Sequence, residues 1–302
     1  MGTFAYHADN PKMSAITGNT VISGGRRSNQ PFCHCYGVKN PKWKKTNENG
    51  HFYMYTYNMW EVPENMKVSN EIGVMPTVMD FYIHFKSDMF FPVVDYGLAK
   101  TPKGELAWIV FEQNDDFSSP WVYAHFERRK RQLYAHNLFN PLIKLIPELE
   151  RIEDYFHGGG VYSLGPELQF CQHDGIVSDL IVRFVPFASF PNQGLFELEE
   201  CDQTCNSNLA MCMAPETRTA HYDRRADVFS LARLLSWWEH GNFWRFDDEL
   251  KQMPFDDAFR ISCERQIEMG LDGIGSHVME KALAFNPEDR YQTLSEFFEA
   301  LT

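Results

Sequence analysis

The chain has 302 residues, enough for two modest domains or one bilobal domain, and this length excludes a peptide or a lone small module. Hydrophobic residues make up 44% and aromatic residues 15% of the sequence, a composition typical of globular proteins that excludes a disordered one. Lysine and arginine number 28 against 41 aspartates and glutamates, and the net charge of -13 argues against a protein that mainly coats nucleic acid or anionic membrane.

The first hundred or so residues favour strands joined by polar turns. Strands are predicted over 16–23, 31–38 and 51–60, and the last of these is rich in the aromatic residues that favour β-structure. The glycine-containing stretch 24–27 is predicted to be a turn. Further along, a helix is predicted over 77–86, and two strands, 91–98 and 105–111, are predicted to flank a turn at 100–104.

From about residue 120 the apolar residues change to a helical spacing. They predict a helix with one buried face, which ends at the three glycines 158–160; its apolar residues are Leu142, Ile143, Leu145, Ile146, Leu149, Ile152 and Phe156. A short β-like region is predicted over 161–190, and helices follow around 228–235 and 294–301. The last helix opens with a capping box from Thr293 to Glu296. Strands followed by helices predict an α+β protein with a helical C-terminal part.

Three short motifs follow one another in the second half of the chain. Ala214-Pro215-Glu216 is followed eleven residues after the glutamate by Asp227 and the sequence D-V-F-S-L, and much later by Arg290. This ordered set resembles the C-lobe of eukaryotic-type protein kinases. The resemblance implies that Glu216, of the APE motif, pairs with Arg290, and that Asp227 holds the backbone of the catalytic loop. A carboxylate and a guanidinium can form such a bidentate pair.

The resemblance extends upstream to two predicted strands. Residues 91–97 and 108–112 resemble the fourth and fifth strands of the kinase N-lobe, with Phe111 near the gatekeeper position. It therefore implies a bilobal kinase-like α+β fold, with a β-rich N-lobe over 1–113 and a mainly helical C-lobe over 114–302. A vestige of the nucleotide pocket would include Phe111, Glu112 and Gln113.

The predicted N-lobe departs from the pattern of active kinases. The stretch 24–27 falls short of the glycine loop G-x-G-x-x-G, and the third predicted strand, 51–60, contains no lysine to bind phosphate. A minority reading takes 35–39 as the third strand instead. Lys39 would then fit the lysine position, and 40–70 would be a long insertion.

The preferred alignment of the catalytic region also lacks the groups that phosphoryl transfer requires. It sets 155–168 on the family's Y-L-H and H-R-D-L-K-P-E-N motifs, and 182–188 on the following strand and D-F-G. Ser163 then replaces the catalytic base, Leu168 the metal-binding asparagine and Pro186 the metal-binding aspartate, while Phe187 keeps the apolar spine. Leu168 and Pro186 have no side-chain oxygen with which to bind a hard cation.

A second alignment stays open beside the first. It sets 172–182 on the catalytic loop, with Asp174 as the base, Asp179 at the asparagine position and Asn192 in a degraded D-F-G. Its spacing to Glu216 is family-like. However, it leaves an unexplained insertion after the glycines 158–160 and still lacks the strongest metal carboxylate.

The resemblance therefore implies a pseudokinase, that is, a kinase-like protein without catalysis, which binds a protein partner as a regulator or as a scaffold subunit. We expect no metal and no cofactor, although vestigial ATP binding without Mg²⁺ is compatible with the alignment. The alternative is a divergent phosphotransferase, or another kinase-fold transferase, that uses Asp174 and Asp179.

The cysteines and the hydropathy pattern indicate where the protein acts. The seven cysteines are an odd number, and the N-terminal residues lack the apolar segment that secretion requires, so we expect the cytoplasm or another reducing compartment. Cys33 and Cys35 favour buried or edge positions over a metal site, and no zinc site is expected at Cys201, Cys205 and Cys212. No stretch approaches 18 uninterrupted apolar residues, so no membrane span is expected, and the negative charge argues against nucleic acid as a partner.

Overall fold

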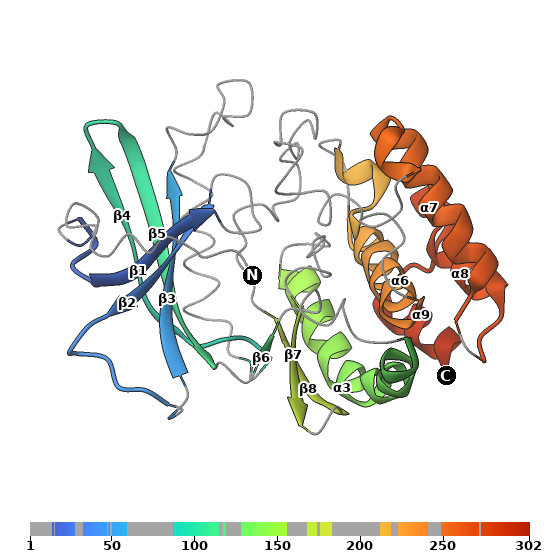
Figure 1. Cartoon of the computed structure of the whole chain (residues 1–302), viewed down its shortest axis with the longest axis horizontal. Coiled ribbons are helices and arrows are strands. Elements are labelled where there is room, and N and C mark those ends of the chain that lie inside the picture. Colours follow the sequence, from blue (N-terminus) through green and yellow to red (C-terminus); the bar gives the residue numbers. More distant parts are fainter. Residues whose placement is uncertain are drawn as a thin grey trace. The chain divides into compact units, whose positions relative to one another are not determined.

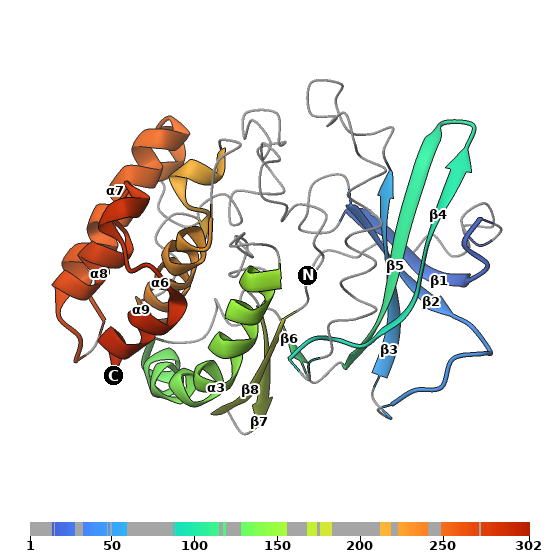
Figure 2. The same ribbon diagram turned by 180° about the vertical axis from the view of Figure 1, so that it is seen from behind.

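The computed structural model divides the chain into two compact units, Met1–Phe117 and Ser118–Thr302. It describes residues 14, 16–27, 33–46, 48, 50–58, 87, 89–114, 117–118, 128–155, 168–173, 176–182, 212–218, 223–240, 249–271 and 273–302. Over these residues the protein has a mixed α+β architecture, as Figures 1 and 2 show from two opposite sides. The predicted α+β class is confirmed at this level.

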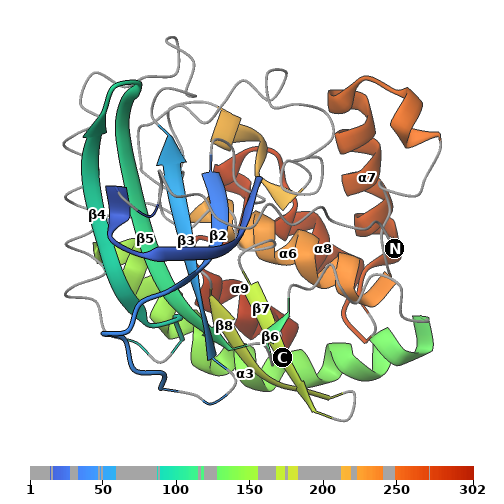
Figure 3. The ribbon, with the colours of Figure 1, turned by 60° about the vertical axis from the view of Figure 1, so that its left-hand side comes forward.

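The first unit is built on a five-stranded antiparallel sheet of order β1-β2-β3-β5-β4. Figure 3 shows how the sheet curls, so that β1 crosses the direction of β4 and β5. The predicted strands 91–98 and 105–111 are confirmed as a hairpin with its tight turn at Thr101 to Gly104. The five strands are β1 (Thr20–Arg27), β2 (Cys33–Lys39), β3 (Gly50–Asn58), β4 (Val93–Thr101) and β5 (Gly104–Asn114).

Two sequence-based predictions for this sheet are wrong. The stretch 24–27 is the second half of β1 rather than a turn, and its register against β2 shifts between Gly24 and Arg26. A glycine inside a strand often marks such a bulge, because the chain bends there without leaving the ladder. The minority reading that made 35–39 the third strand also fails, because Cys33–Lys39 is the second strand and Gly50–Asn58 the third. The predicted helix 77–86 lies outside the described residues.

One face of the sheet carries a continuous apolar core. Strand side chains alternate between the two faces of a sheet, so β2, β3 and β5 each contribute every second residue to this core. The buried members are Val21, Tyr36, Val38, Phe52, Met54, Leu106, Trp108 and Val110. This packing holds β3 and β5 in a register of nine residue pairs, from Gly50 opposite Asn114 to Asn58 opposite Leu106.

Gly97 of β4 lies so close to Trp108 of β5 that no larger residue fits. A Cβ atom at position 97 would lie 2.2 Å from Cζ2 of the Trp108 indole, which is itself buried in the core. We expect Gly97→Ala to lower the free energy of unfolding by about 1–3 kcal/mol through overpacking. Urea denaturation checks this, with Lys100→Ala at an exposed position of β4 as the control. Equal midpoints for the two variants would contradict the close packing.

The second unit contains, in its described residues, a β-hairpin and five α-helices. β6 (Phe117–Ser118), β7 (Leu168–His173) and β8 (Ile176–Val182) form a small sheet in that order, and this confirms the β-like region predicted over 161–190. The helices are α3 (Arg128–Tyr155), α6 (Arg225–His240), α7 (Phe255–Met269), α8 (Ser276–Ala282) and α9 (Leu294–Leu301). Three single turns of 3-10 helix are Pro215–Arg218, Leu250–Gln252 and Pro287–Asp289.

Helix α3 packs against α6, α9 and β8 and so connects most of the described elements of this unit. Its buried face is the predicted one, with Leu142, Leu145, Ile146, Leu149 and Ile152. Ile143 was assigned to the same face, but it is 54% exposed. A helix turns about 100° per residue, so the neighbour of a buried residue is rotated away from the core. None of the helices in the described ranges is long and apolar enough to cross a bilayer.

The cap predicted for α9 is formed, with one change of partner. The Thr293 hydroxyl accepts a hydrogen bond from the backbone N–H of Glu296 at 3.1 Å. The Glu296 carboxylate, however, accepts from the N–H of Gln292 at 2.8 Å rather than from Thr293. Glu150 of α3 adds a second cap, because its carboxylate accepts from both the N–H and the hydroxyl of Ser295, at 2.9 and 2.8 Å. Carboxylates are favourable at this end of a helix.

Candidate functional site

The kinase-like motifs of the second unit meet in a bidentate ion pair. Glu216 lies in the 3-10 turn Pro215–Arg218, and Arg290 directly follows the turn Pro287–Asp289. Nη1 and Nη2 of Arg290 donate to Oε1 and Oε2 of Glu216 at 2.6 and 2.8 Å. Two parallel bonds of this kind fix both the distance and the plane of the two groups, so a segment 74 residues away in the chain is tied to the last helices. We call this pair the clamp.

The clamp is buried without leaving any guanidinium donor unused. The Arg290 side chain is 0% exposed, and its three remaining N–H groups donate to the backbone oxygens of Ala284, Arg225 and Phe285 at 2.5, 3.2 and 3.0 Å. An arginine has five N–H donors, and all five are therefore engaged. The guanidinium also lies over the ring of Phe229 in α6, 5.0 Å from its centroid. Arg290 thus joins α6, the end of α8 and the Glu216 segment.

Asp227, the aspartate of the D-V-F-S-L motif, is fully buried in the first turn of α6. Its backbone N–H donates to the carbonyl of Arg224 at 3.0 Å, which closes the start of the helix. Burial and then the charge of Asp227 raise the pKa of Glu153, in the last turn of α3. The catalytic-loop residues that the kinase resemblance assigns to Asp227 lie outside the described residues, so that role stays a prediction.

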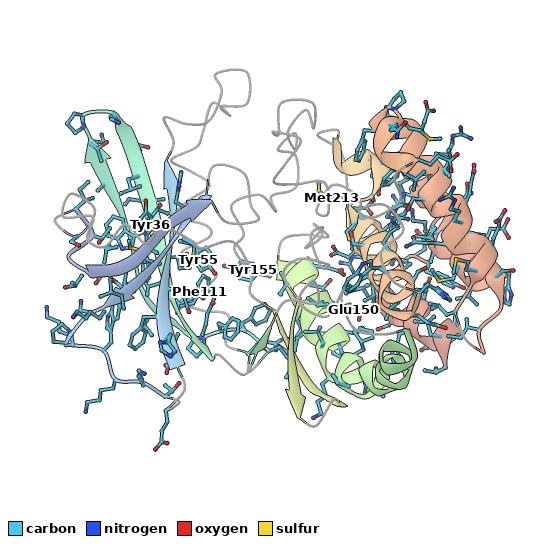
Figure 4. The ribbon with its side chains drawn as sticks, in the orientation of Figure 1. Tyr36, Tyr55, Phe111, Glu150, Tyr155 and Met213 are labelled. Carbon is cyan, nitrogen blue, oxygen red and sulfur yellow. The ribbon has the colours of Figure 1, made fainter. Side chains whose placement is uncertain are left out.

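In the first unit, Phe111 and Gln113 meet the side chain of Tyr55. Tyr55 lies in the middle of β3, and the register puts Tyr53 opposite Phe111 and Tyr55 opposite Ile109, so these residues share one face of the sheet. The rings of Tyr55 and Phe111 meet edge to face at 5.8 Å, and Nε2 of Gln113 donates to the Tyr55 hydroxyl at 3.0 Å. Figure 4 shows Tyr55 and Phe111 beside each other in the sheet. Tyr55 is only 2% exposed.

Glu112, the third residue of the predicted pocket, points to the opposite face. It is opposite Phe52 in the register and is buried. Its carboxylate accepts from the N–H of Thr46 at 2.7 Å and from the Thr46 hydroxyl at 2.8 Å. Because it secures the connection between β2 and β3, Glu112 does not join Phe111 and Gln113 in one side-chain cluster. Of the three predicted pocket residues, Phe111 and Gln113 therefore share one face of the sheet, and Glu112 holds Thr46 on the other.

The structure describes only some of the predicted catalytic positions. Leu168 is the first residue of β7, Asp179 of β8 is opposite Cys171 of β7, and Lys39 is the exposed last residue of β2, paired with Thr20. The remaining predicted positions lie outside the described residues: Ser163, Asp174, Pro186, Phe187 and Asn192. Within the described ranges, no three side chains of histidine, cysteine, aspartate or glutamate are grouped so that they could hold a metal ion.

No protein-family model and no curated protein matches this chain. Sequence reasoning also missed two residues of the described sites, Tyr55 and Glu153. Tyr55 could have been noticed as one of the alternating tyrosines of β3, since residues two apart share a face. Glu153 follows Leu149 by four residues, so the helical period places its carboxylate on the buried face of α3.

Proposed function

We propose that this protein is a pseudokinase: a bilobal kinase-like protein that binds a protein partner, as a regulator or scaffold subunit, and does not transfer phosphate. The observation that carries the proposal is the third strand of the sheet, where Tyr55 and not a lysine lies beside the gatekeeper candidate Phe111. Phosphoryl transfer depends on cations that neutralise the phosphate oxygens. A tyrosine ring packed against phenylalanine supplies no such cation.

The clamp supports the kinase-like part of the proposal. Glu216 and Arg290 were selected from the sequence only by their place in an ordered set of motifs, and they form the bidentate pair that the family resemblance implies. The packing of Arg290 on Phe229 brings the D-V-F-S-L motif into the same cluster. Three motifs far apart in the chain thus act as one unit, as they would in a kinase C-lobe whose activation segment is anchored to its helices.

The β7–β8 hairpin supports the preferred alignment over the alternative one. The preferred alignment expects a strand before the D-F-G position, and β8 ends at Val182, shortly before Pro186. The alternative alignment needs a catalytic loop over the residues that form β7 and β8. Asp179, which that alignment places at the asparagine position, lies instead within the extended strand β8, opposite Cys171 of β7.

We expect no thermal stabilisation of the protein by ATP, with or without Mg²⁺ or Mn²⁺. A ligand that binds only the folded state at a hundred times its Kd would add about 2.7 kcal/mol to the free energy of unfolding, a shift that differential scanning fluorimetry resolves. A small shift that needs no metal would indicate vestigial nucleotide binding and leave the absence of transfer intact.

A metal-dependent thermal shift would contradict the proposal. A shift that requires Mg²⁺ or Mn²⁺ and disappears in Asp174→Asn or Asp179→Asn would contradict the pseudokinase proposal and establish the divergent phosphotransferase. Glu264→Gln, at an exposed position of α7, is a matched control for removing one carboxylate, and it should not alter the response.

A further inference from the structure

Two buried acids meet where α3 packs on α6. Glu153 lies in the last turn of α3 and Asp227 in the first turn of α6, and both residues are 0% exposed. No N–H or O–H group of the described residues donates a hydrogen bond to Oε1 or Oε2 of Glu153. A buried carboxylate without donors is strongly disfavoured, whereas a protonated carboxyl group can itself donate to a neighbouring acid. We call Glu153 and Asp227 the acid pair.

Among the described residues, one cation acts on the carboxyl group of Glu153. This cation is Arg224, whose Nε lies 3.7 Å from Oε2 of Glu153, but its Nη2 pairs with Asp154 at 2.7 Å. The carboxylates that face Glu153 are Asp227 and, one turn earlier in α3, Glu150. Burial first, and then the charge of Asp227, raise the pKa of Glu153 far above its ordinary value of 4.5.

We propose that Glu153 and Asp227 share one proton and that this proton acts as a latch between α3 and α6. In the latched form, the Glu153 O–H donates to the Asp227 carboxylate, and the two acids carry a single negative charge. Loss of the proton places two like charges side by side in a buried junction, which drives the two helix ends apart. The inference concerns the packing of the second unit and does not depend on the proposed pseudokinase function.

Because of the latch, the free energy of unfolding should increase as the pH is lowered. In the unfolded chain Glu153 ionises near pH 4.5, while in the folded protein it keeps its proton to a much higher pH. The stabilisation is therefore complete below pH 4.5 and declines as the pH rises toward the folded-state pKa, because the folded state then binds more protons than the unfolded state.

The first test compares melting temperatures of the full chain between about pH 5 and about pH 9. Glutamine can donate an N–H to Asp227 and cannot ionise, so Glu153→Gln mimics the latched form at every pH. We expect the melting temperature of the wild type to fall by about 3 °C per pH unit relative to Glu153→Gln. The variant should therefore be the more stable protein at pH 8.

The matched control is Glu148→Gln, which removes a carboxylate of the same helix that pairs at the surface with Arg151. It should keep the wild-type dependence on pH. Parallel curves for the wild type and Glu153→Gln would overturn the proposal, because they would mean that Glu153 is ionised in the folded protein.

A second measurement can overturn the proposal with the wild type alone. Infrared spectroscopy of the wild type at pH 8 should show the carbonyl stretch of a protonated carboxylic acid, which ionised carboxylates lack. The band should be missing in Glu153→Gln. In Asp227→Asn it should disappear at a lower pH than in the wild type, because the neighbouring charge has been removed. Absence of the band in the wild type at pH 8 would overturn the latch.

Discussion

Replacing Arg290 by alanine should lower the free energy of unfolding by about 3–5 kcal/mol. The substitution leaves the largely buried Glu216 carboxylate without its bidentate partner and frees the three backbone carbonyls that the guanidinium binds. Breaking a buried pair from one side costs more than the pair contributes as a whole, because the remaining charge stays desolvated. Urea denaturation followed by circular dichroism measures the loss.

Two further variants show whether the loss comes from the clamp. Arg260→Ala removes an exposed arginine of α7 that pairs with Asp257 and Glu264, and we expect a change within about 0.5 kcal/mol. The second is Glu216→Gln, combined with Arg290→Ala in a double-mutant cycle. The two substitutions should be strongly non-additive, since each breaks the same bidentate ion pair. Additive losses would mean that Glu216 and Arg290 stabilise the fold independently.

Replacing Tyr55 by alanine should lower the free energy of unfolding by about 3–5 kcal/mol. The ring is buried in the middle of β3 and packs edge to face on Phe111, so its removal leaves a cavity beside β5. Tyr55→Phe keeps the ring but removes the hydroxyl that accepts from Gln113, and for the loss of this hydrogen bond we expect about 1 kcal/mol. Equilibrium unfolding in urea separates the two effects.

Tyr96→Ala is the control for the Tyr55 variants. Tyr96 is a tyrosine of the same sheet that is 40% exposed, and its removal should cost far less than that of Tyr55. If Tyr55→Ala were no more costly than Tyr96→Ala, the ring would not be packed against β5. The space beside Phe111 would then be open to a ligand, contrary to the basis of the proposed function.

The clamp supports the kinase-like part of the proposed function, and Tyr55 supports the absence of phosphate transfer. The clamp is a structural feature that a kinase-like C-lobe would retain with or without catalysis, because it acts on the packing of helices and not on phosphate. In the proposed kinase-like alignment, Tyr55 takes the place of a cation beside the gatekeeper candidate, and its buried ring packs on Phe111.

The sequence by itself determined the features that depend on neighbouring residues. The hairpin of β4 and β5, the buried face of α3 and the Thr293 cap each follow from local spacing and turn chemistry, and all three are found in the structure. The residues of the clamp were also selected from the sequence, by the order of three motifs. Local spacing, turn residues and the order of motifs can all be read along the chain before it folds.

Apart from the clamp, which the family resemblance implies, only the tertiary structure decided which distant residues became partners. The stretch 24–27 became part of β1 because it pairs with β2, and Glu112 separated from Phe111 because adjacent residues of a strand face opposite sides. Glu153 faces Asp227 because α3 packs on α6, which no pattern within either helix reveals. Pairing of strands and packing of helices join segments far apart in sequence, so the partners, the burial and the ionisation of these side chains arise only when the chain is folded.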